Sequence, residues 1–198
     1  MLIIGLNGSP ITSGNTKFLL EETLKKINDL GANTEILDIA QLLNSAKHPF
    51  CTVCTSPCAA VCYKGTALEE AFNLLKKADG IIVGSPVYFG SITGQTKAFF
   101  DKTRQLRAEK SLCNTVGAGI TVGNAKYGGQ QLAIRALHDI MLVHGMIIVG
   151  DGYREDDCGY HGVSAQKLAQ EDSYALKRTG ILAKRMVEVC EATASLRR

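Results

Sequence analysis

The sequence predicts an α/β protein with an open, parallel five-stranded sheet and helices on both faces. Short apolar runs alternate along the chain with longer stretches of helical periodicity, as in repeated strand–helix units. The third run, residues 79–88, is apolar at consecutive positions, which indicates a strand buried on both faces of a parallel sheet. With 198 residues, the chain is long enough for one domain with a well-buried core.

The expected elements follow in chain order. Strands are expected at 2–7, 34–39, 79–88, 115–123 and 146–151, and helices at 15–30, 66–78, 94–107, 129–145 and 164–192. In the first helix, Leu20, Leu24 and Ile27 recur at three- and four-residue steps, and Gly31 stands where a C-terminal cap belongs. We expect a single domain over 1–198 with two long loops, one at 40–65 and one at 151–163.

Composition and charge limit the binding partners and the cellular compartment that we expect for this protein. The formal net charge of +3 is small and evenly spread, so neither a nucleic-acid nor a membrane partner is expected. The sequence has no apolar run near the roughly 20 residues that span a bilayer, and its beginning lacks the charged lead of a signal peptide. We therefore expect a cytoplasmic protein, in which cysteines stay reduced and a disulfide staple is disfavoured.

The stretch after the first strand, "NGSPITSGNT" at 7–16, has the character of a phosphate loop. It combines small and hydroxyl side chains and leads into a helix, whose first N–H groups attract an anion. Neither GxxxxGK[ST] nor GxGxxG is present, which disfavours a nucleoside triphosphate or a Rossmann-bound dinucleotide. The simpler alternative is a capped helix that follows a tight turn.

Two further loops follow strands at the same predicted sheet edge. In "GSPVYFGSITG" at 84–94, Pro86 stiffens the turn, and Tyr88 and Phe89 offer apolar faces beside glycines, a setting that suits a planar ring. The alternative is a pair of core aromatics at a strand end. The loop "TVGNAKYGG" at 121–129 contains glycines that would let its backbone approach such a ring.

The stretches "GLNGSPITSGNTKFLLEETL" and "ADGIIVGSPVYFGSITGQTKAFFDKT" resemble the NADPH-dependent FMN reductase family, in its multimeric-flavodoxin and iron–sulfur flavoprotein branch. The resemblance covers most of the chain and implies a flavodoxin-like, doubly wound sheet with strand order 2-1-3-4-5. It also implies FMN as the cofactor and NAD(P)H as the electron donor. The flavin would carry the chemistry, so no catalytic side chain is assigned.

The resemblance implies site residues position by position. Those implied for the FMN phosphate are Ser9, Thr12, Ser13, Asn15 and Thr16. Those implied for the ribityl chain and the isoalloxazine ring are Pro86, Val87, Tyr88, Phe89 and Gly90, with Gly123 and Asn124 flanking the ring. In the family a neighbouring subunit often completes this region, so a homodimer or homotetramer is expected.

Four cysteines lie within twelve residues of the long loop, in the pattern C-x2-C-x3-C-x3-C: Cys51, Cys54, Cys58 and Cys62. Thiolates this close could converge on a [4Fe–4S] cluster or zinc, or remain free thiols. Iron–sulfur flavoproteins carry a four-cysteine motif in this loop, with a usual spacing of C-x2-C-x2-C and then a longer gap. This sequence has one more residue in the second gap and a shorter third gap.

These observations favour an FMN-dependent oxidoreductase that uses NAD(P)H and acts on a quinone, flavin or similar acceptor. An alternative is a flavodoxin-type iron–sulfur electron carrier without substrate turnover of its own, whose partner would be a redox protein. A third is a redox sensor or partner-binding protein built on the same scaffold.

Overall fold

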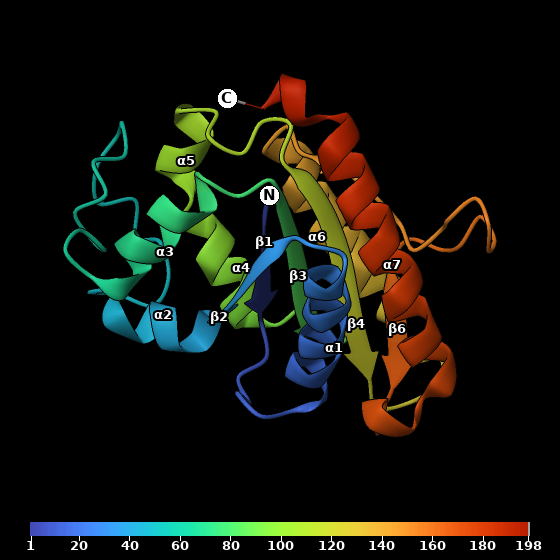
Figure 1. Ribbon diagram of the computed structural model, residues 1–198. Helices are drawn as coiled ribbons and strands as arrows, with labels where there is room; N and C mark the ends of the chain where they lie inside the picture. Colours follow the sequence, from blue (N-terminus) through green and yellow to red (C-terminus); the bar gives the residue numbers. More distant parts are fainter. Residues whose placement is uncertain (198) are drawn as a thin grey trace.

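The computed structural model describes residues 1–197 and shows a parallel sheet between two layers of helices (Figure 1). The strands are β1 (Leu2–Asn7), β2 (Asn33–Asp38), β3 (Gly80–Pro86), β4 (Val116–Gly123), β5 (Ile147–Ile148) and β6 (Val163–Gln166). The helices are α1 (Asn15–Asp29), α2 (Ile39–Ser45), α3 (Ala67–Leu75), α4 (Gly94–Asp101), α5 (Arg104–Ala108), α6 (Gln130–Val143) and α7 (Ser173–Ala192), with 3-10 turns η1 (Ala169–Glu171) and η2 (Ala194–Leu196). The order β2-β1-β3-β4-β5 confirms the predicted topology.

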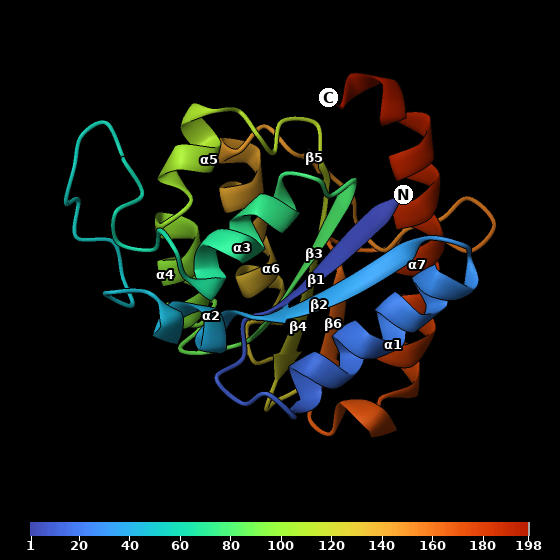
Figure 2. The same ribbon diagram turned by 60° about the vertical axis from the view of Figure 1, so that its left-hand side comes forward.

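The central strands are buried on both faces, which explains their unbroken apolar runs. All eight residues of β4 are buried, as are the first six of β3. Helices α1 and α7 lie side by side on one face, where Leu20, Leu24 and Met186 belong to the same core cluster (Figures 1 and 2). Helices α3, α4 and α6 cover the opposite face, with Phe72 and Phe99 in the second cluster.

The fifth strand position is divided between two segments, which corrects two of the predicted elements. The two residues of β5 pair with the start of β4, and β6 pairs with its second half, from Ile120 to Gly123. The chain leaves the sheet after β5 and returns at Val163, so the strand predicted at 146–151 is shorter than expected. The final helix does not begin at residue 164, because 163–166 complete the sheet edge.

Asp172 determines where the final helix begins. Its Oδ1 accepts a hydrogen bond from Ala175 N at 2.9 Å as the N-cap of α7, and its Oδ2 accepts one from Gln166 N at 3.0 Å. Asp is among the residues preferred at an N-cap because its side chain satisfies an otherwise unpaired N–H group. One carboxylate therefore joins the end of β6 to the start of α7.

Two other differences concern helices. The short helix α2 occupies the beginning of the segment predicted as a loop at 40–65. The helix predicted at 94–107 is interrupted between α4 and α5, where Thr103 Oγ1 donates to Phe100 O at 2.6 Å. The remainder of the cysteine-rich loop extends from the body beside α2 and α3, and its base is closed by Lys47 N donating to Cys62 O at 2.9 Å (Figure 2).

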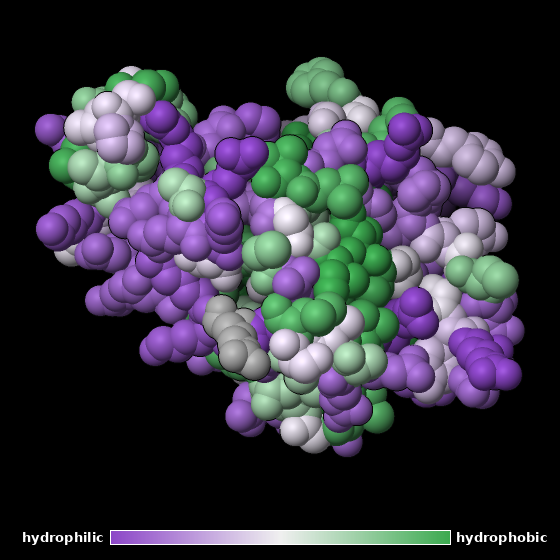
Figure 3. Space-filling view, turned by 90° about the horizontal axis from the view of Figure 1, so that it is seen from above, coloured by the Kyte–Doolittle hydropathy of each residue, from purple (hydrophilic) through white to green (hydrophobic). Residues whose placement is uncertain are grey.

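The end of the molecule where the strands begin carries a band of hydrophobic surface flanked by hydrophilic residues (Figure 3). Exposed apolar side chains in segments that precede strands include Met1 and Leu30. None of the helices within residues 1–197 combines the length and apolar character that crossing a bilayer requires.

Candidate functional site

The three predicted site loops meet at the carboxyl ends of β1, β3 and β4, the edge at which open α/β sheets bind ligands. Backbone hydrogen bonds join the segments directly. Gly8 N donates to Gly84 O at 2.7 Å, and Val87 N donates to Val122 O at 2.9 Å. The segments that follow these strands are thus held at one edge by main-chain contacts.

A buried hydroxyl cluster, Ser85, Thr93 and Thr96, fastens the first loop to the second. Thr93 Oγ1 donates to Gly8 O at 2.7 Å and accepts a hydrogen bond from Thr96 N at 3.1 Å. Ser85 Oγ accepts one from Thr93 N at 3.1 Å. The sequence pattern did not predict this cluster, although Thr93 stands directly before a predicted helix, where an N-cap hydroxyl belongs.

The close approach of Thr93 and Thr96 to the backbone of the first loop requires a glycine at position 8. A β-carbon at Gly8 would lie 2.0 Å from Thr96 Oγ1 and 2.8 Å from Gly84 O, and real β-carbons do not come that close to other atoms. The hydroxyl cluster and the glycine therefore act together: the absence of a side chain at Gly8 lets the threonines reach its carbonyl oxygen.

The phosphate loop ends at Gly14, the N-cap of α1, and no side chain caps this helix. Its first N–H groups are therefore available to an anion, which supports the phosphate-loop prediction over a side-chain-capped helix. Ser9 and Thr16 are buried, Thr12 and Asn15 are half-buried, and Ser13 is exposed.

Asn15 also has a structural partner. Its Oδ1 accepts a hydrogen bond from Ala169 N at 2.8 Å, which ties the start of α1 to η1. Because the oxygen faces this backbone donor, the amide nitrogen of Asn15 points elsewhere and can donate to another acceptor. A change at Asn15 would thus disturb the fold as well as any ligand.

Asn7 and Asp38 hold the other end of this loop. Asn7 Nδ2 donates to Asp38 Oδ1 at 2.7 Å, and Asn7 Oδ1 accepts a hydrogen bond from Ser9 N at 3.1 Å. Lys17 Nζ binds Asp38 Oδ2 at 2.8 Å. The ends of β1 and β2 and the first turn of α1 are therefore linked through one carboxylate.

The second loop presents its aromatic residues to the outside. Tyr88 and Ser91 exchange backbone hydrogen bonds of 2.9 and 3.1 Å, and the two residues between them, Phe89 and Gly90, have φ angles of 49° and 76°. This tight turn leaves Phe89 fully exposed, at 108%, and Tyr88 at 45%. The alternative of core aromatics is therefore wrong. Pro86 and Val87, at the base of the turn, are half-buried.

The third loop lies against the second. Gly129 has a φ of 93°, and a β-carbon there would be 3.2 Å from Gly90 Cα. Gln130 Nε2 donates to Ala125 O at 2.7 Å and packs over Gly123, where a β-carbon would be 2.4 Å from that nitrogen. Asn124 is exposed at the start of this loop. The fold thus brings the predicted ring-binding segments together.

Comparison with known proteins identifies the family. The family described as NADPH-dependent FMN reductase matches residues 1–158. The chain belongs to this family. Its membership, together with the flavoprotein relatives below, supports FMN as the cofactor and flavin-dependent oxidoreduction or electron transfer as the class of activity.

Relatives of this FMN reductase family member match it over nearly all or part of its length. An iron-sulfur flavoprotein of Methanocaldococcus jannaschii is 37% identical over 96% of this chain and 97% of its own length. An NAD(P)H dehydrogenase (quinone) of Geotalea daltonii is 42% identical over 40% of this chain and 38% of its own. The crystal structure of a flavodoxin, WrbA-like protein from Agrobacterium tumefaciens shares the fold, with a TM-score of 0.68 at 18% identity, covering 96% and 97% of the two chains.

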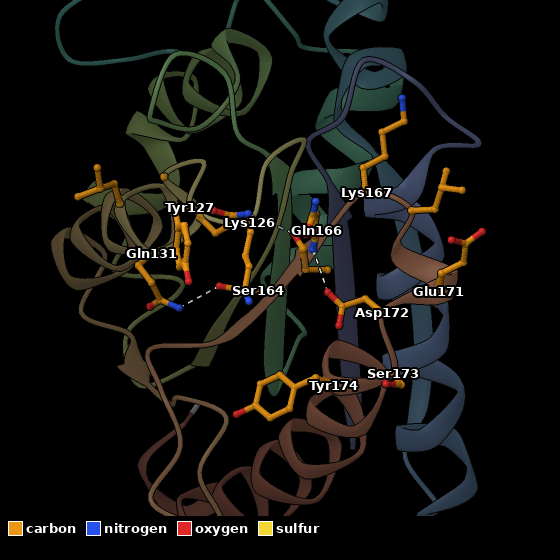
Figure 4. Close-up of a pocket in the computed structure, with 15 residues that line it drawn as sticks. Lys126, Tyr127, Gln131, Ser164, Gln166, Lys167, Glu171, Asp172, Ser173 and Tyr174 are labelled. Atoms are coloured by element: carbon orange, nitrogen blue, oxygen red, sulfur yellow. Dashed lines mark hydrogen bonds between the residues drawn. The ribbon is translucent and has the colours of Figure 1, made fainter.

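A cavity of about 900 Å³ is lined by the third loop, β6 and the starts of α6 and α7 (Figure 4). Lys126 and Tyr127 reach it from that loop, and Tyr174 from the start of α7. Gln131 Nε2 donates to Ser164 Oγ at 2.9 Å across its wall. None of the residues predicted to hold FMN lines this cavity, although Gly129 of the third loop does.

The four loop cysteines are separate in this structure. Cys54 is exposed and Cys51, Cys58 and Cys62 are half-buried, all as free thiols. Within residues 1–197, no three or more side chains of the His, Cys, Asp and Glu types gather closely enough to hold a metal ion. The fold brings the two ends of the loop together at Cys62 but does not by itself bring all four thiols to one point.

Cys62 has a charged neighbour. Lys102, only 2% exposed, points its Nζ at Cys62 Sγ, 3.6 Å away. Tyr63 packs edge-on against Phe72 and binds Gln105 Oε1 through its hydroxyl at 3.2 Å. Burial raises the pKa of Tyr63 well above its ordinary value, and negative charge at Cys58 and Cys62 adds to this rise. Cys62 therefore lies at the base of the loop, beside the protein body.

Proposed function

We propose that the protein is an FMN-dependent oxidoreductase that accepts electrons from NAD(P)H and passes them to a quinone, flavin or similar small acceptor. The observation that carries this proposal is the joining of three loops at one sheet edge, through Gly8–Gly84, Thr93–Gly8 and the approach of Gly129 to Gly90. FMN bound at this edge would supply the hydride and electron chemistry.

The residues at this edge fit the parts of FMN. The uncapped start of α1, with Thr12 and Ser13 beside it, would donate hydrogen bonds to the phosphate. The turn with Tyr88 and Phe89 would form an apolar wall for the ring. Glycine backbone in the third loop would border the ring. The roles of all the sequence-predicted FMN residues remain predictions.

FMN titration with matched variants tests this assignment. We expect purified protein to quench FMN fluorescence on binding, and Ser13→Ala to weaken FMN binding by about 1 kcal/mol, the value of one hydrogen bond or cap. Ser195→Ala removes an exposed hydroxyl from η2 and serves as the control. Equal FMN affinity in wild type, Ser13→Ala and Thr12→Ala would contradict the phosphate-loop assignment.

Catalytic turnover distinguishes an oxidoreductase from a protein that only carries electrons. We expect steady-state oxidation of NADH or NADPH with a quinone or dye acceptor, dependent on bound FMN. An FMN-loaded protein that is reduced once but does not turn over with any such acceptor would favour the electron carrier instead.

A second candidate function is iron–sulfur electron transfer, favoured by the cysteine loop. Four thiols within twelve residues form a donor set that suits a [4Fe–4S] cluster, and the Lys102 ammonium lies 3.6 Å from the sulfur of Cys62. The relative from Methanocaldococcus jannaschii is named an iron-sulfur flavoprotein. We propose Cys51, Cys54, Cys58 and Cys62 as the ligands, which would require the loop to close beyond the conformation described.

Iron and sulfide analysis of anaerobically prepared protein tests the cluster. We expect wild-type protein to contain both, and Cys54→Ser to lose iron. Cys113→Ser changes an exposed cysteine outside the loop and is the matched control. Zinc in place of iron, or neither metal, would contradict the cluster.

We also propose that the protein acts as a homodimer or homotetramer. Phe89 and Tyr127, at 108% and 91% exposure, stand at the edge that would hold the flavin, and a second subunit would cover them. Light scattering coupled to size-exclusion chromatography tests this, and a monomer at micromolar concentration would contradict it.

A further inference from the structure

The cavity of about 900 Å³ is large enough for a nucleotide-sized ligand, and it meets the predicted flavin edge at one point. Gly129 lines the cavity, and a β-carbon on Gly129 would lie 3.2 Å from Gly90 Cα, in the turn predicted to border the ring. A ligand that extends out of this cavity past Gly129 would therefore approach the ring-binding turn.

Two tyrosines give the cavity flat apolar surfaces. Tyr127 comes from the third loop and Tyr174 from the first turn of α7, and both are exposed (Figure 4). The Tyr174 ring also lies 5.9 Å from the guanidinium of the buried Arg178, which restricts its movement. Aromatic rings that are open to solvent on one face are suited to stacking against a nucleobase.

Gln131 and Ser164 add neutral polar groups to the wall. Gln131 Nε2 donates to Ser164 Oγ at 2.9 Å, and both side chains are half-buried. An amide and a hydroxyl have more donor and acceptor positions than this single bond uses. They can therefore contact the hydroxyl groups of a sugar or the edge of a base without adding charge.

Lys126 is the cation that the cavity leaves without a carboxylate partner. Of the other charged residues in the lining, Lys167 and Glu171 lie four residues apart in one segment and are opposite in charge, and Asp172 already accepts two backbone hydrogen bonds. Within residues 1–197, Lys126 forms no ion pair, and its ammonium lies 5.7 Å from the centre of the Tyr127 ring. An anionic group beside Tyr127 would meet this free ammonium.

We infer that this cavity binds the adenosine end of NADPH, with Lys126 contacting the phosphate on the ribose and a tyrosine ring stacking on the adenine. The inference deepens the proposed function and rests on it, because the nicotinamide end would then lie at the flavin edge past Gly129. NADH carries a ribose 2′-hydroxyl, which a carboxylate recognises, whereas NADPH carries a phosphate there, which a cation recognises. Since Asp172 is engaged by the backbone and Lys126 is free, the cavity favours NADPH.

Isothermal titration calorimetry of the full-length protein in the presence of FMN tests the role of Lys126. The probes are adenosine 2′,5′-bisphosphate and adenosine 5′-monophosphate, which differ in one phosphate. We expect wild type to bind the bisphosphate about tenfold more tightly, because one charge-assisted contact distinguishes the two probes. Lys126→Met should lose this preference and Lys126→Arg should keep it. Lys25→Met changes an exposed lysine of α1 and should bind both probes as wild type does.

Steady-state oxidation of NADPH and NADH separates this inference from the proposed function. We expect Lys126→Met to raise the KM for NADPH about tenfold and to leave the KM for NADH unchanged. Equal affinity of wild type for the two probes, or a Lys126→Met protein that keeps the preference, would overturn the inference, while NADH turnover would leave the proposed function standing. Absence of turnover with either nucleotide would overturn the proposed function. A bisphosphate preference that depends on Lys126 would even then support the cavity as a nucleotide site.

Discussion

Arg178 donates to Asp151 through Nε at 2.7 Å, and the two side chains are 2% and 1% exposed. Nη1 of the same guanidinium contacts both oxygens of Asp157 at 2.8 Å. The rings of Tyr160 and Tyr174 lie 5.9 Å from its centre. One buried side chain of α7 thus holds the segment that interrupts the fifth strand position.

Replacing Arg178 should destabilise the fold strongly. We expect Arg178→Met to lower the free energy of unfolding by about 3–5 kcal/mol, because it leaves the carboxylate of Asp151 buried without its partner. Urea unfolding followed by circular dichroism measures this. Arg135→Met, on the exposed side of α6, is the control and should change stability by less than about 0.5 kcal/mol. Equal stability of the two variants would contradict the structural role of Arg178.

Gly8→Ala should reduce FMN affinity through the loops rather than through a lost contact. The new methyl group would displace Thr96 or Gly84 and separate the first two loops. We expect the FMN dissociation constant to rise at least tenfold, a loss of about 1.4 kcal/mol in binding free energy, measured by fluorescence titration. Gly94→Ala adds a methyl group with nothing within 4 Å and should bind FMN as wild type does. Normal FMN affinity in Gly8→Ala would show that the junction does not support the site.

Stability should decline below pH 6.5 because of His144. Burial, and then the charge of Arg107, lower the pKa of this imidazole below its ordinary value of 6.5. Thr103 donates to Phe100 O, so its oxygen accepts from His144 Nε2 at 2.9 Å, and the neutral ring carries its proton on Nε2. Below pH 6.5 the unfolded chain binds this proton more readily than the folded one, so stability is lost as the pH falls toward the folded pKa.

The variant His144→Gln measures the contribution of this imidazole. We expect its unfolding free energy to change less between pH 7 and pH 5.5 than that of wild type. His48→Gln replaces an exposed histidine of the cysteine loop and should keep the wild-type slope. Identical slopes in wild type and both variants would refute a neutral, buried His144.

Cys190 should resist alkylation in the folded protein. Its side chain is fully buried, its Sγ donates to Asp79 O at 3.4 Å, and burial raises its thiol pKa to about 12. Because the thiolate is the reactive form, we expect iodoacetamide at pH 8 to label the exposed Cys113 and Cys158 and to leave Cys190 unmodified. Peptide mass spectrometry measures the alkylation of each cysteine, with urea-unfolded protein as the control. Labelling of Cys190 at the rate of Cys113 would contradict its burial.

Local patterns in the sequence determined most of the architecture. Helical and strand periodicities need only neighbours two to four residues away, so the alternation of strands and helices could be predicted, except for the fifth strand position and the start of the final helix. The glycine- and hydroxyl-rich loops were predictable for the same reason: their backbone chemistry is local, and a parallel sheet brings its strand ends to one edge. The family resemblance of the first and second loops then led to FMN.

Tertiary structure decided the features that depend on distant partners. Thr93 meets Gly8 across 85 residues and Lys102 meets Cys62 across 40, and no periodicity encodes either contact. The division of the fifth strand position follows from pairing with β4, which competes successfully with the helical pattern after residue 163. Burial, which selects partners for Arg178 and Lys102, exists only once the chain has folded. The sequence therefore determined which loops lie at the sheet edge, and packing decided which side chains hold those loops there.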